Sequence, residues 1–267
     1  MPHSGHEQNR RLWNEIAEVH YRHPEHNVQR FLSDPDFLSL HPTEQDEVGT
    51  VAGKSLLHLQ CQFGMDTLSW RRKGASYVCG VDISEVSIHL ATRLAREAQI
   101  DKAEFVCSDV LDLSGKLDRT FDIVFQSYGT YIWLADLRRW ARVIAEHLKP
   151  GGYFYIIDQH PIWQLFGYPN EKLDYFATEP TAYPGGIDPD YCDRSYTPRE
   201  GSVEWMHTLS SIVNSLIETG LRIDFLNEFP FFYYAAFEDW HEKDGLWYPP
   251  DGPQRYPMMF SLKATRE

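Results

Sequence analysis

The stretch that decides the fold is "SLLHLQCQFGMDTLSW", from Ser55 to Trp70. It begins with a short apolar run typical of a buried β-strand, passes through a small loop, and continues at once as a helix. A strand, a tight loop and a helix in this order begin the nucleotide-binding half of a doubly wound α/β fold. Such loops usually contain two or three glycines. This loop retains only Gly64 and has Gln60 and Gln62 at two of the expected glycine positions.

Beyond this stretch, predicted strands alternate with predicted helices. Strands alternating with helices predict a parallel sheet with right-handed crossovers. A later helix at 208–220 is followed by two strand-like runs that could complete the sheet. The strand-like runs are 55–59, 77–81, 103–106, 121–125, 153–157, 221–229 and 258–264, and the helices between the first five are 65–73, 84–98 and 135–148.

Two segments, 161–205 and about 230–256, do not follow the alternation. Residues 161–257 contain more than half of the aromatic residues of the chain, with many prolines and glycines. Loops this long in a compact domain are usually functional or disordered, and aromatic content argues against disorder. We therefore predict aromatic-rich lid insertions; a surface that only supports oligomerisation is the alternative. The predicted organisation is a helical N-terminal cap (1–50), a ligand-binding core (51–160), a lid insertion (161–205), and a C-terminal part of the core (206–267) that contains the second insertion.

The composition restricts the partners. Hydrophobic residues make up 42% and charged residues 24% of the chain, which is ordinary for a globular protein. A formal charge of −14 argues against nucleic acid, which requires a cationic surface. No apolar run reaches the roughly 18 residues of a membrane span. The first residues lack the apolar region of a signal peptide, and the four cysteines lack paired spacing, so we expect buried free thiols and a cytoplasmic location.

The residues that directly follow each strand are the candidate ligand-binding residues, because parallel sheets bind ligands at the carboxyl ends of their strands. Asp82 follows the second strand and could accept hydrogen bonds from both hydroxyls of a ribose, at about 1.5–3 kcal/mol each. Asp109 follows the third strand and could accept a hydrogen bond from the amine of an adenine. The two carboxylates indicate a ligand that contains adenosine.

The glutamines distinguish between adenosine ligands. A dinucleotide fold also has an acidic residue about 20 positions after its loop, as Asp82 is here. A pyrophosphate, however, requires bare backbone amides, and Gln60 and Gln62 place side chains in its path. We also expect glutamine to avoid the left-handed conformation of such turns, which costs a non-glycine residue about 1–2 kcal/mol. S-adenosylmethionine has no phosphate, and amide side chains can hydrogen-bond its amino-acid tail.

Five motifs resemble those of the class I S-adenosylmethionine-dependent methyltransferases, in order and spacing. They are "LLHLQCQFG", "DTLSW", "GVDIS", "SYGTYIWLADLRRWA" and "LKPGGYFYI", and they are most similar to a bacterial branch of small-molecule methyltransferases with "HLQC" in the first motif. The resemblance covers residues 54–157 and the C-terminal strands. It implies a Rossmann-like, doubly wound sheet of about seven strands, the last one antiparallel, with S-adenosylmethionine as the cofactor.

The resemblance also assigns cofactor contacts to residues of this chain. The first motif has His58 in place of the usual acidic residue, so we expect Gln60, Gln62, Trp13 or Tyr21 to help hold the methionine ammonium. The other implied contacts are Gln60, Cys61 and Gly64 with the methionine part, Asp82 with the ribose, Ile83, Asp109 and Val110 with the adenine, and Gln126 near the amino group.

Candidates for the transfer chemistry lie after the fourth and fifth strands. His160, near Asp158, could remove a proton from the acceptor or contact it, and a structural histidine before a proline turn is the alternative. For Tyr128 a pocket-lining role is the alternative. Candidate substrate contacts are Tyr21, Trp133, Trp163, Trp205 and His207, since aromatic faces attract a sulfonium or an amine by roughly 0.5–2 kcal/mol; core packing or helix capping is the alternative for each.

Two patterns superficially suggest metal binding. "HYRHPEH" contains His20, His23 and His26, but Pro24 interrupts the helix that would align them. "DPDYCD" contains three carboxylates but lacks the glycine and the terminal glutamate of a calcium loop. We therefore predict no metal site.

The predicted function is transfer of a methyl group from S-adenosylmethionine to a nitrogen or oxygen of a small molecule, by in-line displacement. A nicotinamide-dependent oxidoreductase would share Asp82 but should have a glycine-rich phosphate loop. A non-catalytic nucleoside-binding protein, or other chemistry with the same cofactor, is also compatible with the motifs. The sequence does not predict an oligomeric state.

Overall fold

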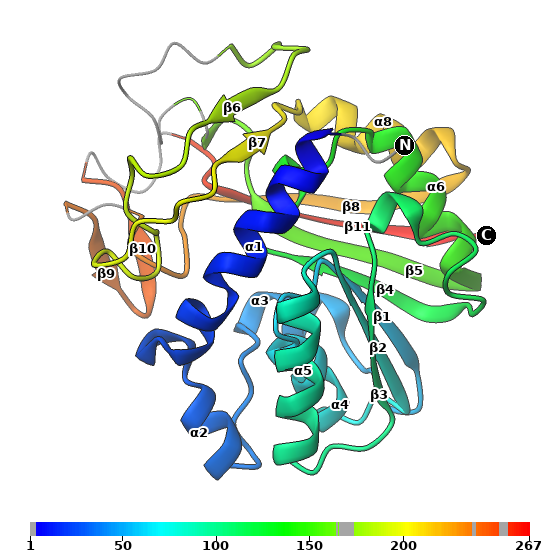
Figure 1. Ribbon diagram of the computed structural model, residues 1–267. Helices are drawn as coiled ribbons and strands as arrows, with labels where there is room; N and C mark the ends of the chain where they lie inside the picture. Colours follow the sequence, from blue (N-terminus) through cyan, green and yellow to red (C-terminus); the bar gives the residue numbers. More distant parts are fainter. Residues whose placement is uncertain (1–3, 164, 166–173, 237–238, 251–255) are drawn as a thin grey trace.

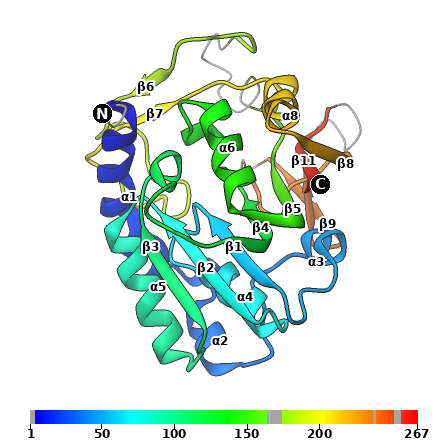
Figure 2. The same ribbon diagram turned by 90° about the vertical axis from the view of Figure 1, so that its right-hand side faces the viewer.

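The computed structural model describes residues 4–163, 165, 174–236, 239–250 and 256–267. A central sheet has helices on both faces (Figures 1 and 2). Its strands are β1 (Ser55–Leu59), β2 (Tyr77–Asp82), β3 (Ala103–Cys107), β4 (Phe121–Ser127), β5 (Leu148–Gln159), β8 (Leu221–Phe229) and β11 (Met259–Arg266). The helices are α1 (Ser4–Arg22), α2 (Val28–Ser33), α3 (Pro42–Val48), α4 (Met65–Arg72), α5 (Glu85–Glu97), α6 (Leu137–His147) and α8 (Leu209–Glu218), with 3-10 turns η1 (Pro24–His26), η2 (Val110–Asp112) and η3 (Tyr131–Trp133).

The strand order is β3-β2-β1-β4-β5-β11-β8. Neighbouring strands from β3 to β5 are parallel, whereas β11 is antiparallel to both β5 and β8. The predicted seven-stranded, Rossmann-like sheet with an antiparallel last strand is therefore confirmed. The order reverses between β1 and β4, and ligands of doubly wound sheets bind outside the carboxyl ends of the strands at this switch point.

Two apolar layers hold the helices on the sheet. Trp140 and Ile144, on one face of α6, are fully buried between α6, α8 and the sheet. The opposite face of the sheet packs against α3 and α4, with Trp70 and Tyr155 fully buried there. The spacing of apolar residues in α6 predicted this burial, whereas α3 was not predicted as a separate helix.

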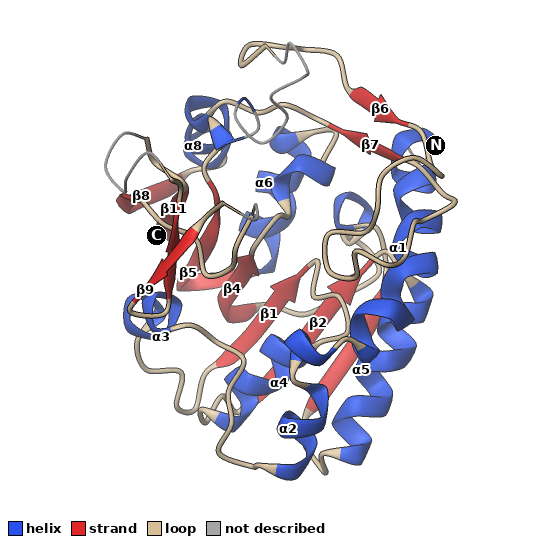
Figure 3. Cartoon of the chain, turned by 90° about the vertical axis from the view of Figure 1, so that its left-hand side faces the viewer, coloured by secondary structure: helices blue, strands red, loops and turns tan. Residues whose placement is uncertain are grey.

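The first helix crosses the carboxyl edge of the sheet (Figures 1 and 3). The hydrogen bonds of its side chains reach residues that follow three neighbouring strands. His6 contacts Asp109 after β3, Asn14 contacts Ser84 after β2, and His20 contacts Gln62 after β1. Helix α1 therefore covers the edge at which a ligand of this fold binds.

Part of the first predicted insertion is attached to the outer side of α1. It contains β6 (Thr181–Tyr183) and β7 (Ser202–Glu204), which pair with each other. The Asn9 carboxamide makes two buried hydrogen bonds to the backbone of Val203, donating to its carbonyl at 2.7 Å and accepting from its N–H at 2.8 Å. Glu15 accepts hydrogen bonds from Tyr196 Oη and from the Arg199 and Glu200 amides. Helix α1 and this segment thus form one layer, here called the cap.

The second predicted insertion contains a hairpin of β9 (His241–Lys243) and β10 (Leu246–Tyr248). Phe232 bridges to Trp247 and packs against Trp163, with ring centroids 5.0 Å apart. Residues 164, 166–173, 237–238 and 251–255 of the two predicted insertions lie outside the described residues.

All four cysteines are free thiols, but the prediction that all are buried is wrong for two of them. Cys61 and Cys79 are buried, whereas Cys107 is exposed and Cys192 is partly exposed. Cys107 ends β3, which is an edge strand and lacks a neighbour on one side. In the described part of the chain, no helix has the length and apolar character needed to cross a membrane.

The Asn9→Ala change tests the attachment of the cap. It leaves the N–H and carbonyl of Val203 without their partner, and we expect the free energy of unfolding to fall by about 1–3 kcal/mol. Arg22→Ala is the control, because Arg22 forms only an exposed ion pair with Glu18, and we expect a change within about 0.5 kcal/mol. Urea unfolding followed by circular dichroism measures both changes. Equal effects of the two substitutions would contradict the proposed attachment.

Candidate functional site

The loop after β1 adopts the turn that glycines usually form. Gln60, Gln62 and Gly64 all have positive φ angles, of 54°, 50° and 75°. The expectation that glutamine avoids this conformation is therefore wrong. The cost of about 1–2 kcal/mol per residue is offset by hydrogen bonds that the side chains make to neighbouring elements. Gln60 Nε2 donates to the Thr130 carbonyl at 3.0 Å, and Gln62 Nε2 lies 3.0 Å from Nδ1 of His20.

A buried hydrogen-bond network joins this loop to the carboxyl end of β4. Gln126 Nε2 donates to Gln60 Oε1 at 2.9 Å and to Thr130 Oγ1 at 2.8 Å, while Gln126 Oε1 accepts from Trp140 Nε1 at 2.8 Å. Asp158, at the end of β5, accepts hydrogen bonds from the Gly129 and Thr130 amides and from Thr130 Oγ1. Burial raises the pKa of Asp158 although these bonds oppose the shift. The network fixes the loop at the switch point of the sheet.

Asp82 lies where a ribose would bind in this fold. Its Oδ2 accepts from the Gln62 amide at 2.8 Å and its Oδ1 from the Ser84 amide at 2.9 Å. The Ile83 amide makes a further, weaker hydrogen bond to this carboxylate. An ionised carboxylate has about four acceptor positions, so Asp82 keeps acceptor capacity for a ligand. Burial raises the pKa of Asp82 to about 6, although the backbone hydrogen bonds oppose the shift. A buried carboxylate with an open acceptor position fits a ligand hydroxyl. Ile83 beside it is half-buried.

The third strand ends at Asp109, whose carboxylate is already in contact with the cap. Oδ2 lies 2.5 Å from His6 Nδ1, and Oδ1 accepts from the Leu111 amide at 2.9 Å. His6 Nε2 accepts from the Ala135 amide, so Nδ1 carries the proton and donates to Asp109. Burial opposes ionisation, but the His6 hydrogen bond lowers the pKa of Asp109 below its usual value. No sequence pattern around His6 indicates this role.

The remaining residues of the first motif make packing contacts in the interior. His58 Nδ1 lies 2.8 Å from Thr67 Oγ1, and burial lowers the pKa of His58 to about 3, so its ring is neutral and cannot replace an acidic residue. The Cys61 thiol faces Gly80, and burial raises its pKa. A side chain on Gly64 would lie 2.4 Å from the ring of Phe105, so close packing requires this glycine. Val110, which follows Asp109, is buried in the core beneath α6.

The aromatic candidates fall into separate groups. The structure brings together Trp13 and Trp133, whose rings are perpendicular with centroids 5.5 Å apart, and Trp133 Nε1 donates to the Gly129 carbonyl. Trp205 packs against His6 with centroids 5.2 Å apart. Trp163, at the start of the first insertion, packs against Phe232 of the second insertion and is not part of the Trp13–Trp133 pair.

Two other predicted substrate contacts have packing positions. His207 Nε2 donates to the Leu134 carbonyl at 2.7 Å. Tyr21 packs against Phe63 with ring centroids 5.5 Å apart, and the Arg93 guanidinium lies 4.6 Å from its ring centroid. These contacts anchor the 131–134 turn and α1, and a role in substrate binding stays a prediction.

The two catalytic candidates lie after neighbouring strands, and each has a carboxyl partner. Tyr128 has a φ angle of 52° and donates its hydroxyl to Glu44 of α3 at 2.7 Å. Burial raises the pKa of Glu44 to about 8 and, beside Glu44, raises that of Tyr128 well above its usual value. His160 Nε2 lies 2.9 Å from Glu228 Oε1, its Nδ1 accepts from the Ile162 amide, and burial lowers its pKa. The sequence gave no signal for Glu44, which lies in the charged segment "PTEQDEV".

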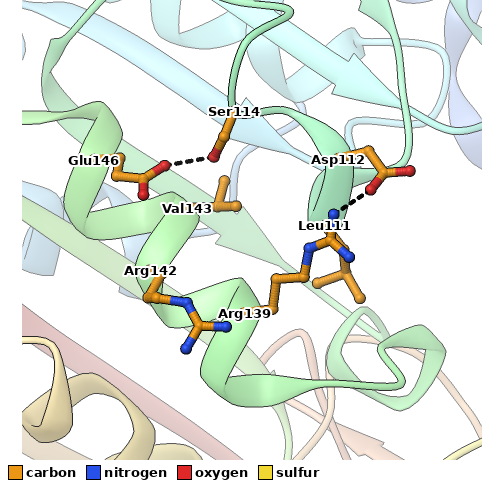
Figure 4. Close-up of a pocket in the computed structure, with 7 residues that line it drawn as sticks. All are labelled: Leu111, Asp112, Ser114, Arg139, Arg142, Val143 and Glu146. Atoms are coloured by element: carbon orange, nitrogen blue, oxygen red, sulfur yellow. Dashed lines mark hydrogen bonds and ion pairs between the residues drawn. The ribbon is translucent and has the colours of Figure 1, made fainter. Parts of the chain in front are cut away.

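A groove on the outside of the core lies between η2 and α6 (Figure 4). Three of its four charged side chains have partners within the groove, Arg139 with Asp112 and Glu146 with Ser114. None of the residues predicted to bind cofactor or substrate lines it. The candidate site is therefore the carboxyl edge beneath the cap.

This strand order, with a ribose-type carboxylate after β2, defines a Rossmann-like methyltransferase architecture. Residues 56–152 match a family described as "Methyltransferase domain". A 134-residue region is 28% identical to a ubiquinone biosynthesis O-methyltransferase of Neisseria meningitidis, covering 47% of this chain and 56% of that protein. The matched domain and this relative support a class I S-adenosylmethionine-dependent methyltransferase.

Solved structures show the same fold over the whole chain. One is an S-adenosylmethionine-dependent methyltransferase from Clostridium acetobutylicum, with a TM-score of 0.59 and 15% identity, covering 95% of this chain and 98% of that one. Another is geranyl diphosphate C-methyltransferase from Streptomyces coelicolor, with a TM-score of 0.59 and 14% identity, covering 100% and 99%. The match to the curated relatives spans little more than half of their length, so the substrate is inferred separately below.

The pKa of Asp82 predicts a pH dependence of cofactor binding. Only the ionised carboxylate can accept hydrogen bonds from both ribose hydroxyls, so affinity should be constant above pH 7 and fall about tenfold per pH unit below pH 6. Isothermal titration calorimetry with S-adenosylhomocysteine from pH 5 to 8 measures it. Asp82→Asn should bind weakly and independently of pH, whereas the exposed control Asp101→Asn should behave as the wild type. Constant affinity down to pH 5 in the wild type would contradict this role of Asp82.

Proposed function

We propose that this protein transfers the methyl group of S-adenosylmethionine to an oxygen or nitrogen atom of a small molecule. The observation that carries the proposal is the buried Asp82 carboxylate, which follows β2 of a methyltransferase domain and keeps acceptor capacity for a ligand. The O-methyltransferase name of the Neisseria relatives supports oxygen as the first acceptor to test.

Different residues at the carboxyl edge are proposed to hold different parts of the cofactor. Asp82 orients the ribose, and Ile83, Asp109 and Val110 border the adenine. The network of Gln60, Gln126 and Thr130 holds the loops at the methionine end. We further propose that the faces of Trp13 and Trp133 attract the sulfonium and compensate in part for the missing acidic residue at His58.

When bound, the cofactor supplies a methyl group that is already activated by the sulfonium. The protein's main task is then to hold the acceptor in line at roughly 3–3.5 Å and to accept its proton. We propose His160 and Tyr128 as the acceptor contacts. Burial lowers the pKa of His160 and favours its neutral form, but Nδ1 must release the Ile162 amide before it can accept a proton. Glu44 fixes the hydroxyl of Tyr128.

The cap is proposed to act as a lid over this site. Helix α1 crosses the ends of three strands, and the insertion is attached to its outer side. A lid excludes water from the transferring methyl group and strengthens the electrostatic interactions beneath it. The aromatic hairpin of the second insertion is proposed to border the acceptor side.

A turnover assay tests the proposal. The purified protein is incubated with S-adenosylmethionine and pools of phenols, catechols, carboxylic acids and amines, and mass spectrometry detects S-adenosylhomocysteine together with a methylated product. We expect an oxygen or nitrogen acceptor. His160→Gln and Tyr128→Phe should each lower kcat/KM at least tenfold while leaving the Kd of the cofactor unchanged, because proton transfer contributes about 10²–10⁴-fold.

His89→Gln is the matched control, because His89 is exposed on α5 away from the carboxyl edge. NAD is included as a competing ligand. Binding of S-adenosylmethionine without turnover of any pool would favour a non-catalytic protein. Binding of NAD alone would favour an oxidoreductase.

A further inference from the structure

Two motifs that are far apart in the sequence meet in the cap. "HYRHPEH" lies at the end of α1, and "DPDYCD" lies in the insertion between β6 and β7. Their residues His20, Asp190 and Cys192 place one candidate ligand atom each within 4.8 Å of the others. The side chain of His20 is fully buried and that of Asp190 is 2% exposed.

The geometry of Asp190 leaves one oxygen available. His20 Nε2 lies 3.0 Å from Oδ1 and 2.9 Å from Oδ2. Oδ1 also accepts from the backbone amides of Cys192 and Asp193, at 2.9 Å each. These two bonds orient the carboxylate and form the turn that brings the Cys192 thiol back toward it, so Oδ2 retains its capacity to bind a cation.

Unpaired imidazole nitrogens adjoin the same cluster. The His26 ring stacks on His20 with centroids 5.6 Å apart. Its Nε2 and the Nδ1 of His23 are buried and have no hydrogen-bond partner among the described residues. Buried polar atoms are nearly always paired in proteins, so two such nitrogens beside a nitrogen, oxygen and sulfur donor set require an explanation.

We propose that His20, Asp190 and Cys192 form a zinc site that joins α1 to the insertion. A thiolate, an imidazole and a carboxylate suit the tetrahedral, borderline-soft Zn²⁺ rather than Mg²⁺ or Ca²⁺, which prefer oxygen ligands. Water would fill the fourth position. Binding releases the thiol proton of Cys192 and requires the Nδ1–H tautomer of His20.

Gln62, which lies beside His20, connects this site to the loop after β1. A metal-bound histidine usually donates its other N–H to an oxygen acceptor. The residue beside His20 Nδ1 is Gln62. Rotation of its carboxamide by half a turn about the Cγ–Cδ bond would place its oxygen, instead of its nitrogen, next to Nδ1. Zinc would thus fix the end of α1, the insertion and the loop after β1 in one arrangement. Its role is structural, holding the cap over the carboxyl edge, and the inference does not depend on which acceptor is methylated.

Metal uptake tests the proposal without an activity assay. The protein is treated with a chelator, dialysed, and titrated with Zn²⁺ or Co²⁺. We expect one equivalent of metal per chain by elemental analysis, and a cobalt spectrum with tetrahedral bands and a thiolate-to-metal charge-transfer band. Cys192→Ser should abolish the charge-transfer band, and both Cys192→Ser and Asp190→Asn should weaken zinc binding at least tenfold. Cys107→Ser is the control, because Cys107 is exposed on the edge strand, and its spectrum should match that of the wild type.

Circular dichroism and cofactor binding establish that each variant is folded. Absence of stoichiometric metal uptake by the folded wild type would overturn the proposal and leave His20 and Asp190 as a hydrogen-bonded pair. Retention of the charge-transfer band in Cys192→Ser would overturn the assignment of the thiolate. Neither result would bear on methyl transfer, which the turnover assay measures independently.

Discussion

The left-handed turn after β1 is the constraint on which the rest of the site depends. Gln60 and Gln62 stabilise this turn by side-chain hydrogen bonds. Glycine would adopt the same turn because it has no side chain to clash. Because the turn has this shape, the Gln62 amide reaches Asp82 after β2. Because the residues are glutamines, the same turn is also tied to β4 and to α1. Glutamine in place of glycine thus makes the turn less favourable for the backbone but adds hydrogen bonds from the turn to neighbouring elements.

Those cross-links explain why the cap is so closely integrated with the core. Helix α1 is bonded to the sheet edge by buried polar side chains on its inner side and to the insertion by Asn9 and Glu15 on its outer side. Burial opposes ionisation of Glu15, yet hydrogen bonds from Arg199, Glu200 and Tyr196 lower its pKa to about 2. Polar contacts of this kind have specific directions, so they select one position of the cap over many. An apolar interface alone would allow it to slide.

Burial raises the pKa of each carboxyl group of the site, but the outcome depends on the partners. The pKa values of Asp82 and Glu44 stay raised although hydrogen bonds oppose the shift, whereas the hydrogen bond and the charge of His6 lower that of Asp109. A carboxylate with unused acceptor capacity is a binding position, and one that is already paired is a structural element. This difference supports the proposal that Asp82 is a ligand contact, whereas Asp109 is already paired with His6.

The sequence alone determined the α/β class, the strands of the sheet and the position of the Asp82 carboxylate after the second strand, because strand and helix periodicities and the end of a strand are local properties of the chain. The short helix α3 and the conformation of the glutamines were not predicted, since a side chain that reaches a distant residue can override local preference. The partners of the site were decided only by the tertiary structure: His6 on Asp109, Glu44 on Tyr128 and His20 beside Cys192 join residues separated by about 80 to 170 positions. Such pairs leave no periodic pattern, because they arise only when the cap and the loops fold over the edge of the completed sheet.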